Sequence, residues 1–197
     1  IEPVDLRRGP PELSETCRGF CFIGYRSDDG IARNLGRPGA AAGPASIRRR
    51  LAELPVTFSS AVRLLDAGDL GLDGGPVESA QESLAGTVEQ MRSAGLFPII
   101  LGGGHDLTFG HWLGLHRSLP RSDRLGVVSF DAHFDLRAPG DGATSGTSFR
   151  QISLECERSG RPFRTLCLGI QRSANTVAHF RSARELGVEH ILARDIA

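Results

Sequence analysis

Lysine is missing from this sequence of 197 residues, in which all 23 Lys and Arg positions are arginine. A lysine amine forms Schiff bases with carbonyl compounds and binds the phosphates of nucleotides in phosphate-binding loops. Enzyme classes that depend on such a lysine are therefore excluded. A codon bias toward arginine explains the absence without any function, and the exclusion is the same in either case.

The sequence also lacks net charge and long apolar segments. Its 23 acidic residues balance the 23 arginines, so nothing favours binding to nucleic acid or to an acidic membrane. No apolar run approaches the roughly 20 residues that cross a bilayer, and no charged-then-apolar leader opens the chain. With 40% hydrophobic residues, the composition is typical of a globular protein. We expect a cytoplasmic protein that binds neither nucleic acid nor membrane.

Cysteine is scarce and is not arranged for a tetrahedral metal site. Of Cys17, Cys21, Cys156 and Cys167, only the first two are close in the sequence, and no second close pair completes a site. Cys21 and Cys167 lie in apolar, strand-like runs, where a thiol behaves as a small buried hydrophobe. We expect all four to be reduced and structural.

Strand-like and helix-like segments alternate along the chain. Such alternation is typical of a doubly wound, mainly parallel sheet between two layers of helices, a three-layer αβα fold. No linker, repeat or low-complexity tract divides residues 1–197, so we expect one domain. His111 and His116 fall on an expected helix and are interpreted as surface or capping residues. The expected strands are 19–24, 62–66, 96–101, 125–130, 163–170 and 188–192, and the expected helices are 46–54, 77–94, 107–117 and 176–186.

Metal-binding residue types follow two of these strands. Asp131, His133 and Asp135 come at alternate positions after the apolar run 125–130, and alternate side chains of an extended chain point the same way. We expect that strand to be buried on both faces. His105 follows three glycines after strand 96–101. Ligands bind outside the carboxyl ends of parallel strands, so the two groups can share one site.

Each group has a simpler explanation when it is taken alone. A single histidine after glycines is more often a loop residue than a metal ligand. Two carboxylates and an imidazole packed together are harder to explain, because without a cation they repel one another or stay unpaired. Together the groups indicate a metal site. An oxygen-rich set with imidazole suits manganese and, less selectively, zinc, iron or cobalt.

These residues resemble the first two metal motifs of the ureohydrolase family, which includes arginase, agmatinase and formimidoylglutamase. The motifs are Gly-Gly-Gly-His-Asp at 102–106 and Ser-Phe-Asp-Ala-His-Phe-Asp-Leu-Arg at 129–137. Within the family, the sequence is most similar to formimidoylglutamases, with further matching stretches at 27–44, 144–152 and 167–176. The resemblance spans nearly the whole chain and implies an arginase-like α/β fold.

The resemblance implies two Mn²⁺ ions held by His105, Asp131, His133 and Asp135, with Asp131 as the bridging ligand. Asp131 and His133 are then also the expected catalytic residues. Two cations lower the pKa of a shared water, so that a hydroxide able to attack an amidine or guanidine carbon exists near neutral pH.

The expected substrate depends on the loop after these ligands. Arginase-like and agmatinase-like sequences carry a histidine there, in a His-Gly-x-Pro motif, whereas this chain has Ser145-Gly146-Thr147-Ser148. Ser145 is typical of formimidoylglutamase-like sequences, and Ser148 replaces the usual proline. The resemblance therefore implies hydrolysis of N-formimino-L-glutamate to L-glutamate and formamide, a step of histidine degradation.

A dicarboxylate substrate also needs cationic or amide partners. Arg37 and Arg137 lie in the two long glycine-rich loops, and Arg172 and Asn175 follow a strand end. Arginine can bind a carboxylate through two parallel hydrogen bonds, and we assign these four residues, with Ser145, to the substrate. For any one of them alone, a surface salt bridge is the simpler explanation.

Other functions remain open at this point. The chain could be an agmatinase-like or guanidinobutyrase-like ureohydrolase, or a non-catalytic binding module that keeps the fold. A zinc deacetylase of distantly similar fold would need paired histidines and a catalytic tyrosine, and Tyr25 is the only tyrosine.

Family members carry one more metal motif, of the type Asp-x-Asp, which the resemblance places beyond residue 197. Nothing after Asp135 matches it, and the chain opens with Ile1. We expect a piece covering the first two thirds of the family domain. Such a piece would hold one ion well, have little activity, and expose part of its sheet, which favours self-association.

Overall fold

The computed structural model describes residues 1–9, 11, 18–71 and 74–196. Parallel strands alternate with helices along the chain, which confirms the expected α/β class. The strands are β1 (Glu2–Pro3), β2 (Arg18–Tyr25), β3 (Val62–Asp69), β4 (Leu96–Gly102), β5 (Val127–Phe130), β6 (Thr165–Ile170) and β7 (Glu189–Leu192). The helices are α1 (Asp29–Arg33), α2 (Gly43–Leu51), α3 (Val77–Ser93), α4 (Leu107–Ser118), α5 (Ser148–Ser159) and α6 (Val177–Glu185).

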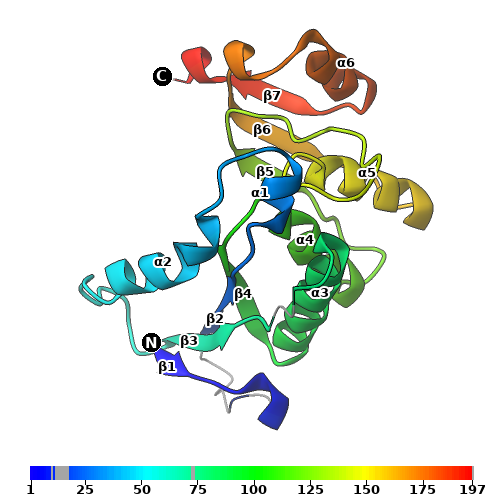
Figure 1. The fold of residues 1–197 in the computed structure, drawn as a ribbon. Coiled ribbons are helices and arrows are strands. Elements are labelled where there is room, and N and C mark those ends of the chain that lie inside the picture. Colours follow the sequence, from blue (N-terminus) through cyan, green and yellow to red (C-terminus); the bar gives the residue numbers. More distant parts are fainter. Residues whose placement is uncertain (10, 12–17, 72–73, 197) are drawn as a thin grey trace.

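The seven described strands form two hydrogen-bonded sheets. The first has the order β1-β3-β2-β4 and the second has the order β5-β6-β7, and every pairing is parallel. The first sheet occupies the lower part of Figure 1, with α2 on one side of it and α3 on the other, and the second sheet lies above.

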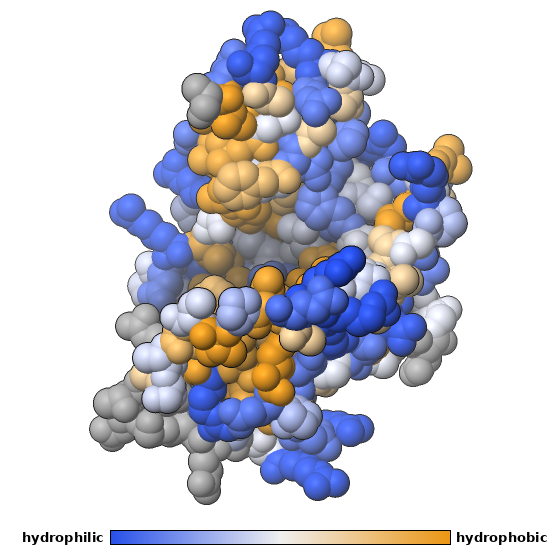
Figure 2. Space-filling model, turned by 90° about the vertical axis from the view of Figure 1, so that its left-hand side faces the viewer, coloured by the Kyte–Doolittle hydropathy of each residue, from blue (hydrophilic) through white to orange (hydrophobic). Residues whose placement is uncertain are grey.

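Strand β5 is not buried on both faces, so this expectation is wrong. Val128 is 60% exposed and Phe130 is 82% exposed, because among the described strands β5 pairs only with β6. Phe97 on β4, the edge strand of the first sheet, is 56% exposed. Figure 2 shows hydrophobic surface above and below a hollow on this side of the molecule. Both β4 and β5 thus carry apolar side chains that are exposed to solvent.

Each sheet has its own hydrophobic core, and helix α4 contributes to both. Leu107 and Leu115 pack against the core of the first sheet, whereas Trp112 and Leu113 belong to the core of the second. Helix α4 can approach α3 closely because it carries glycine at position 114. A Cβ atom there would collide with the carbonyl oxygen of Ala85 and with Val88. The α3–α4 pair is therefore one of the contacts that join the two cores.

Helix α5 was not expected from the sequence. It buries Phe149, Ile152 and Cys156, which recur at helical spacing, and it ends at Gly160 in the left-handed conformation that glycine favours. The signal was present, but the stretch directly follows a long glycine-rich loop.

Cysteine behaves as expected in the described part of the chain. Cys21, Cys156 and Cys167 are buried and free of disulfides, and burial raises the pKa of each thiol. Cys17 lies outside the described residues. Among the described helices, none combines the length and the apolar character needed to span a membrane.

The two histidines of α4 are not surface or capping residues. His116 stacks on Trp112 with ring centroids 4.7 Å apart, and its side chain is 14% exposed. Burial lowers the pKa of His116, and it lowers the pKa of His111 to about 4. The helix was placed correctly, but the second core that covers this face could not be inferred from the helical pattern.

We expect the free energy of unfolding to fall as the pH drops from about 6.5 toward 4. Histidine in the unfolded chain has a pKa near 6.5, above the depressed folded value of His111, so the unfolded state takes up the proton first. Stability that is complete above that unfolded pKa is lost on acidification, by up to about 2 kcal/mol at pH 5. Urea unfolding at pH of about 7 and 5 measures the loss. It should be smaller in His111→Gln, and equal losses in both proteins would contradict this account.

Candidate metal centre

His105 reaches the site through a glycine turn. Strand β4 ends at Gly102 and helix α4 begins at Leu107. Gly103 has a φ of 74°, and a Cβ there would collide with the carbonyl oxygen of Tyr25. Asp106, the residue after His105, is fully buried and accepts a 2.6 Å hydrogen bond from the Tyr25 hydroxyl. The loop that carries His105 is thus fixed to the first sheet on both sides.

Asp131 and Asp135 come from a bend that directly follows β5. Phe134 and Leu136 anchor this bend in the core of the second sheet. Asp135 has a φ of 46°, a left-handed conformation that aspartate tolerates better than most residues. Its carbonyl oxygen accepts a 3.2 Å hydrogen bond from the backbone of Phe149 at the start of α5. The bend is therefore held by its own apolar residues and by α5.

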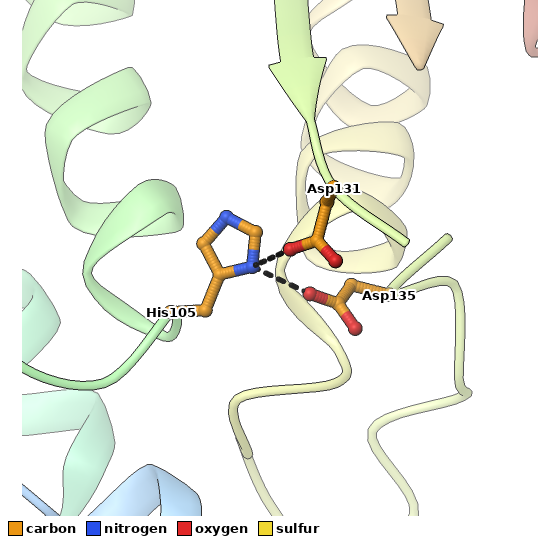
Figure 3. Close-up of side chains that lie close together, drawn as sticks. All are labelled: His105, Asp131 and Asp135. Atoms are coloured by element: carbon orange, nitrogen blue, oxygen red, sulfur yellow. Dashed lines mark hydrogen bonds and ion pairs between the residues drawn. The ribbon is translucent and has the colours of Figure 1, made fainter. Parts of the chain in front are cut away.

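Three ligand groups converge between the two sheets. Nδ1 of His105 lies 2.6 Å from Oδ2 of Asp135 and 3.3 Å from Oδ2 of Asp131. Figure 3 shows the imidazole, which comes from the start of α4, facing the two carboxylates beyond the end of β5. One ligand atom from each residue lies within 4.8 Å of the other two. One imidazole nitrogen and two carboxylate oxygens at this separation fit a divalent cation such as Mn²⁺.

His133 does not join this cluster as closely as the sequence pattern suggested. Its side chain is 58% exposed, and its Nδ1 lies 3.2 Å from Oδ1 of Asp131. Its backbone N–H also donates to that oxygen, over 2.9 Å. The chain bends after Phe130, so the residues that follow do not alternate as they would along a strand.

The electrostatics of the cluster favour positive charge. Burial of the imidazole opposes protonation of His105, but its hydrogen bond to Asp135 and the charges of Asp135 and Asp131 outweigh burial and raise its pKa. A carboxylate pair that stabilises a proton at this position also stabilises a cation at it. The electrostatic environment and the types of ligand atom therefore both favour a bound cation.

The cluster lines a pocket of about 270 Å³. Asn175, Ser145 and Arg137, three of the residues assigned to the substrate, also line it. The residues that line the pocket are Ile31, Asn34, His105, Asp131, His133, Asp135, Arg137, Ser145, Asn175 and His179. All four predicted metal ligands and three of the five predicted substrate residues thus share one pocket.

Asn175 uses its side-chain amide to hold the ligand bend. Its Nδ2 donates to the carbonyl oxygens of Ala132 and Gln171, at 2.7 and 2.8 Å, and its Oδ1 accepts from the backbone of Phe134 at 3.1 Å. These three bonds tie the bend after β5 to the end of β6. Its substrate role stays a prediction.

Arg37 and Arg172 do not line this pocket. Arg37 is exposed, and Arg172 lies over the ring of Phe180, 5.6 Å from its centroid, beside a different cavity. Their assignment to the substrate stays a prediction that the pocket does not support.

Three residues of the pocket were missed from the sequence: Ile31, Asn34 and His179. His179 lies in the first turn of α6 and completes a capping box with Thr176, which a search for capping signals could have found. Burial and the charge of Arg137 lower the pKa of His179. Ile31 and Asn34 carry no local signal, because α1 is a five-residue helix inside a long loop.

The arginase family model matches residues 18–197, and the chain belongs to this family. Its fold and its His–Asp–Asp cluster at the carboxyl ends of two parallel strands agree with that membership.

Within the family, the chain is similar to proteins named formimidoylglutamase. It is 48% identical over 178 residues to that of Chromobacterium violaceum, a match that covers 90% of this chain and 56% of the relative. It is 50% identical over 171 residues to that of Ralstonia nicotianae, with 85% of this chain and 52% of the relative covered. The chain thus spans just over half the length of these two curated relatives.

A solved structure supports the same grouping. Formiminoglutamase of Trypanosoma cruzi with Mn²⁺ superposes with a TM-score of 0.80 at 29% identity, covering 98% of this chain and 66% of that one. The resemblance to formimidoylglutamases is therefore confirmed in both sequence and fold.

Proposed function

We propose that this chain is the metal-binding part of an enzyme that hydrolyses N-formimino-L-glutamate to L-glutamate and formamide. The observation that carries the proposal is one pocket that is lined both by the His105–Asp131–Asp135 cluster and by Arg137 and Ser145. Such a pocket suits a substrate that has an amidine at one end and carboxylates at the other. The similarity to proteins named formimidoylglutamase supports the same reaction.

The residues of the cluster have a role in binding and in orientation. His105, Asp131 and Asp135 would hold one Mn²⁺, and Asp131 with His133 would contribute to a second. When bound, these ions would lower the pKa of a water molecule toward neutrality. Asn175 keeps the ligand bend in place through its three backbone hydrogen bonds.

The other end of the pocket would bind the glutamate portion. The Arg137 guanidinium and the Ser145 hydroxyl can donate hydrogen bonds to a carboxylate, and this would hold the amidine carbon near the His105–Asp131–Asp135 cluster. In the reaction, one water adds to the amidine carbon, the bond from that carbon to the glutamate nitrogen breaks, and the nitrogen takes a proton. The products are L-glutamate and formamide.

We expect formimino-glutamate to be the preferred substrate of the site. Turnover of formimino-glutamate, arginine, agmatine and guanidinobutyrate with added Mn²⁺ should be compared in this chain and in the Chromobacterium violaceum relative. Ser145 stands where guanidine-cleaving relatives are expected to have histidine, so every guanidine should be turned over at least about tenfold more slowly. Faster turnover of any guanidine would overturn the assignment and favour an agmatinase-like reaction.

A non-catalytic binding module is the alternative to this enzyme, and the relatives named formimidoylglutamase do not favour it. It predicts that loss of the metal cluster leaves ligand binding unchanged. Binding of L-glutamate with and without Mn²⁺ separates it from the enzyme, because a catalytic pocket should bind the product more tightly when the metal is present.

A further inference from the structure

Asn34 ends helix α1 at the edge of the pocket. Its backbone N–H donates to the carbonyl oxygens of Gly30 and Ile31, at 3.2 and 3.0 Å, and the next residue, Leu35, has a φ of 59°. A left-handed residue directly after the helix stops it at this point. The position of the Asn34 side chain is thus set by the helix end.

The Asn34 side chain joins two pocket residues that come from far along the chain. Its Oδ1 accepts a 2.6 Å hydrogen bond from the Arg137 guanidinium, and its Nδ2 donates a 3.1 Å hydrogen bond to Oγ of Ser145. Backbone bonds fix the same loop, because Ser145 N–H donates to the carbonyl oxygen of Gly30 at 2.9 Å and Arg137 N–H to that of Gly146 at 3.0 Å. All three side chains therefore keep one mutual arrangement.

The guanidinium of Arg137 is bound by an amide in this arrangement. Within the described residues, no carboxylate lies within ion-pairing distance of its guanidinium, whereas nearby Arg33 is paired with Glu78 at 3.1 Å. A neutral amide can hold a guanidinium in place without cancelling its charge. The remaining N–H groups of Arg137 stay available to an anion in the pocket.

The same amide also sets the polarity of Ser145. Guanidinium groups only donate hydrogen bonds, so the oxygen of the Asn34 amide must face Arg137 and the NH₂ group must face Ser145. The Ser145 oxygen accepts this bond, and its own O–H is left to donate. The single side chain of Asn34 thus orients two donors, the charged Arg137 guanidinium and the neutral Ser145 hydroxyl.

We propose that Asn34 is a positioning residue for substrate specificity, which keeps Arg137 and Ser145 as hydrogen-bond donors for a carboxylate of the bound molecule. The proposal rests on the proposed function for the identity of that molecule. In the alternative interpretation, Asn34 is only a structural link, here called a latch, that stabilises the contact between α1 and the loop after the metal ligands.

The variant Asn34→Asp separates these readings because it keeps the shape of the side chain. As a latch, an aspartate should be as good as asparagine or better, since it forms a charge-assisted bond to Arg137. As a positioning residue, aspartate should be worse than alanine. It would neutralise Arg137 and place a negative charge beside the substrate carboxylate, whereas alanine leaves Arg137 charged.

The experiment is a calorimetric titration of L-glutamate into the Mn²⁺-loaded 197-residue protein and its variants. We expect Asn34→Asp to weaken binding by about tenfold or more and Asn34→Ala by about threefold. Thermal unfolding should show Asn34→Asp to be at least as stable as the wild type. In an Arg137→Gln background, Asn34→Asp should weaken binding by a smaller factor than in the wild-type background, because the charge it would cancel is gone and only its repulsion of the substrate carboxylate remains.

Three results would overturn the proposal: wild-type protein that does not bind L-glutamate, Asn34→Asp that binds it as the wild type does, or Asn34→Ala that binds it more weakly than Asn34→Asp. Turnover measurements keep this test apart from that of the proposed function. If glutamate binding follows the expected order but a guanidine is the better substrate, the proposed function fails and the role of Asn34 stands.

Discussion

Tight Mn²⁺ binding should be lost when Asp131 is replaced by asparagine. Asp131 lies 3.3 Å from His105 through one oxygen and 3.2 Å from His133 through the other, so both sides of the cluster use this carboxylate. An amide keeps the shape but removes the negative charge that offsets the cation. Removal of a residue outside the ligand shell typically costs 10–100-fold in affinity, so loss of a charged ligand should cost about 100-fold or more.

Electron paramagnetic resonance of free Mn²⁺ in titrations of the two proteins measures this loss. Asp141→Asn is a matched control, because Asp141 is an exposed carboxylate in the loop after the ligands and is not part of the cluster. The control should bind Mn²⁺ as the wild type does. Unchanged binding by Asp131→Asn, in a protein that still unfolds cooperatively, would show that the ion lies elsewhere.

The 197-residue chain should bind one Mn²⁺ tightly and should be a poor catalyst. The described cluster offers one ion three ligand groups, whereas a second ion would share Asp131 and gain only the exposed His133. An ion with two protein ligands is held weakly, and a binuclear centre then lacks one of its two cations. If that cation supplies about 4 kcal/mol of transition-state stabilisation, turnover falls about 1000-fold.

Metal analysis after gel filtration gives the stoichiometry, and turnover of formimino-glutamate should be compared with that of the Chromobacterium violaceum relative. Two variants sharpen the test. His105→Ala should release the tight ion, whereas His133→Ala should weaken its binding by about 10- to 100-fold only, since His133 stands outside the three-ligand set but contacts the carboxylate of Asp131. Two tightly bound ions per chain, or activity equal to that of the relative, would show that the ligand assignment is wrong.

Much of the fold could be predicted because its signals are local. The apolar run that forms β4 and the helical stripe of α3, with Leu84, Val88 and Met91 buried, are present in the sequence and fold as expected. The exposure of Val128 and Phe130 could not be predicted. An apolar strand has the same sequence whether or not a neighbour covers it, and only the sheet order shows that β5 lies at an edge.

The candidate metal ligands could be recognised in the sequence, whereas other residues that line the pocket could not. Asp131, His133 and Asp135 are unusual as a group, and a strand precedes them, so their chemistry is visible in a few residues. Asn34 is an ordinary loop residue until the fold brings it to Ser145, 111 positions away. Such contacts between distant loops leave no periodic pattern. The same limit applies to His133, whose departure from the cluster depends on a bend rather than on residue type.

The separate cores of the two sheets give the metal centre a mechanical role. His105 is anchored to the first sheet through Asp106 and Tyr25, whereas Asp131 and Asp135 are anchored to the second through Phe134 and its neighbours. A cation held by all three residues is a cross-link between two parts of the chain that also meet through α4 and through the contacts of Asn34 with Arg137 and Ser145. The binding energy of the cation therefore also stabilises one relative orientation of these two parts. A force that tilts one part against the other lowers the affinity for the cation in return.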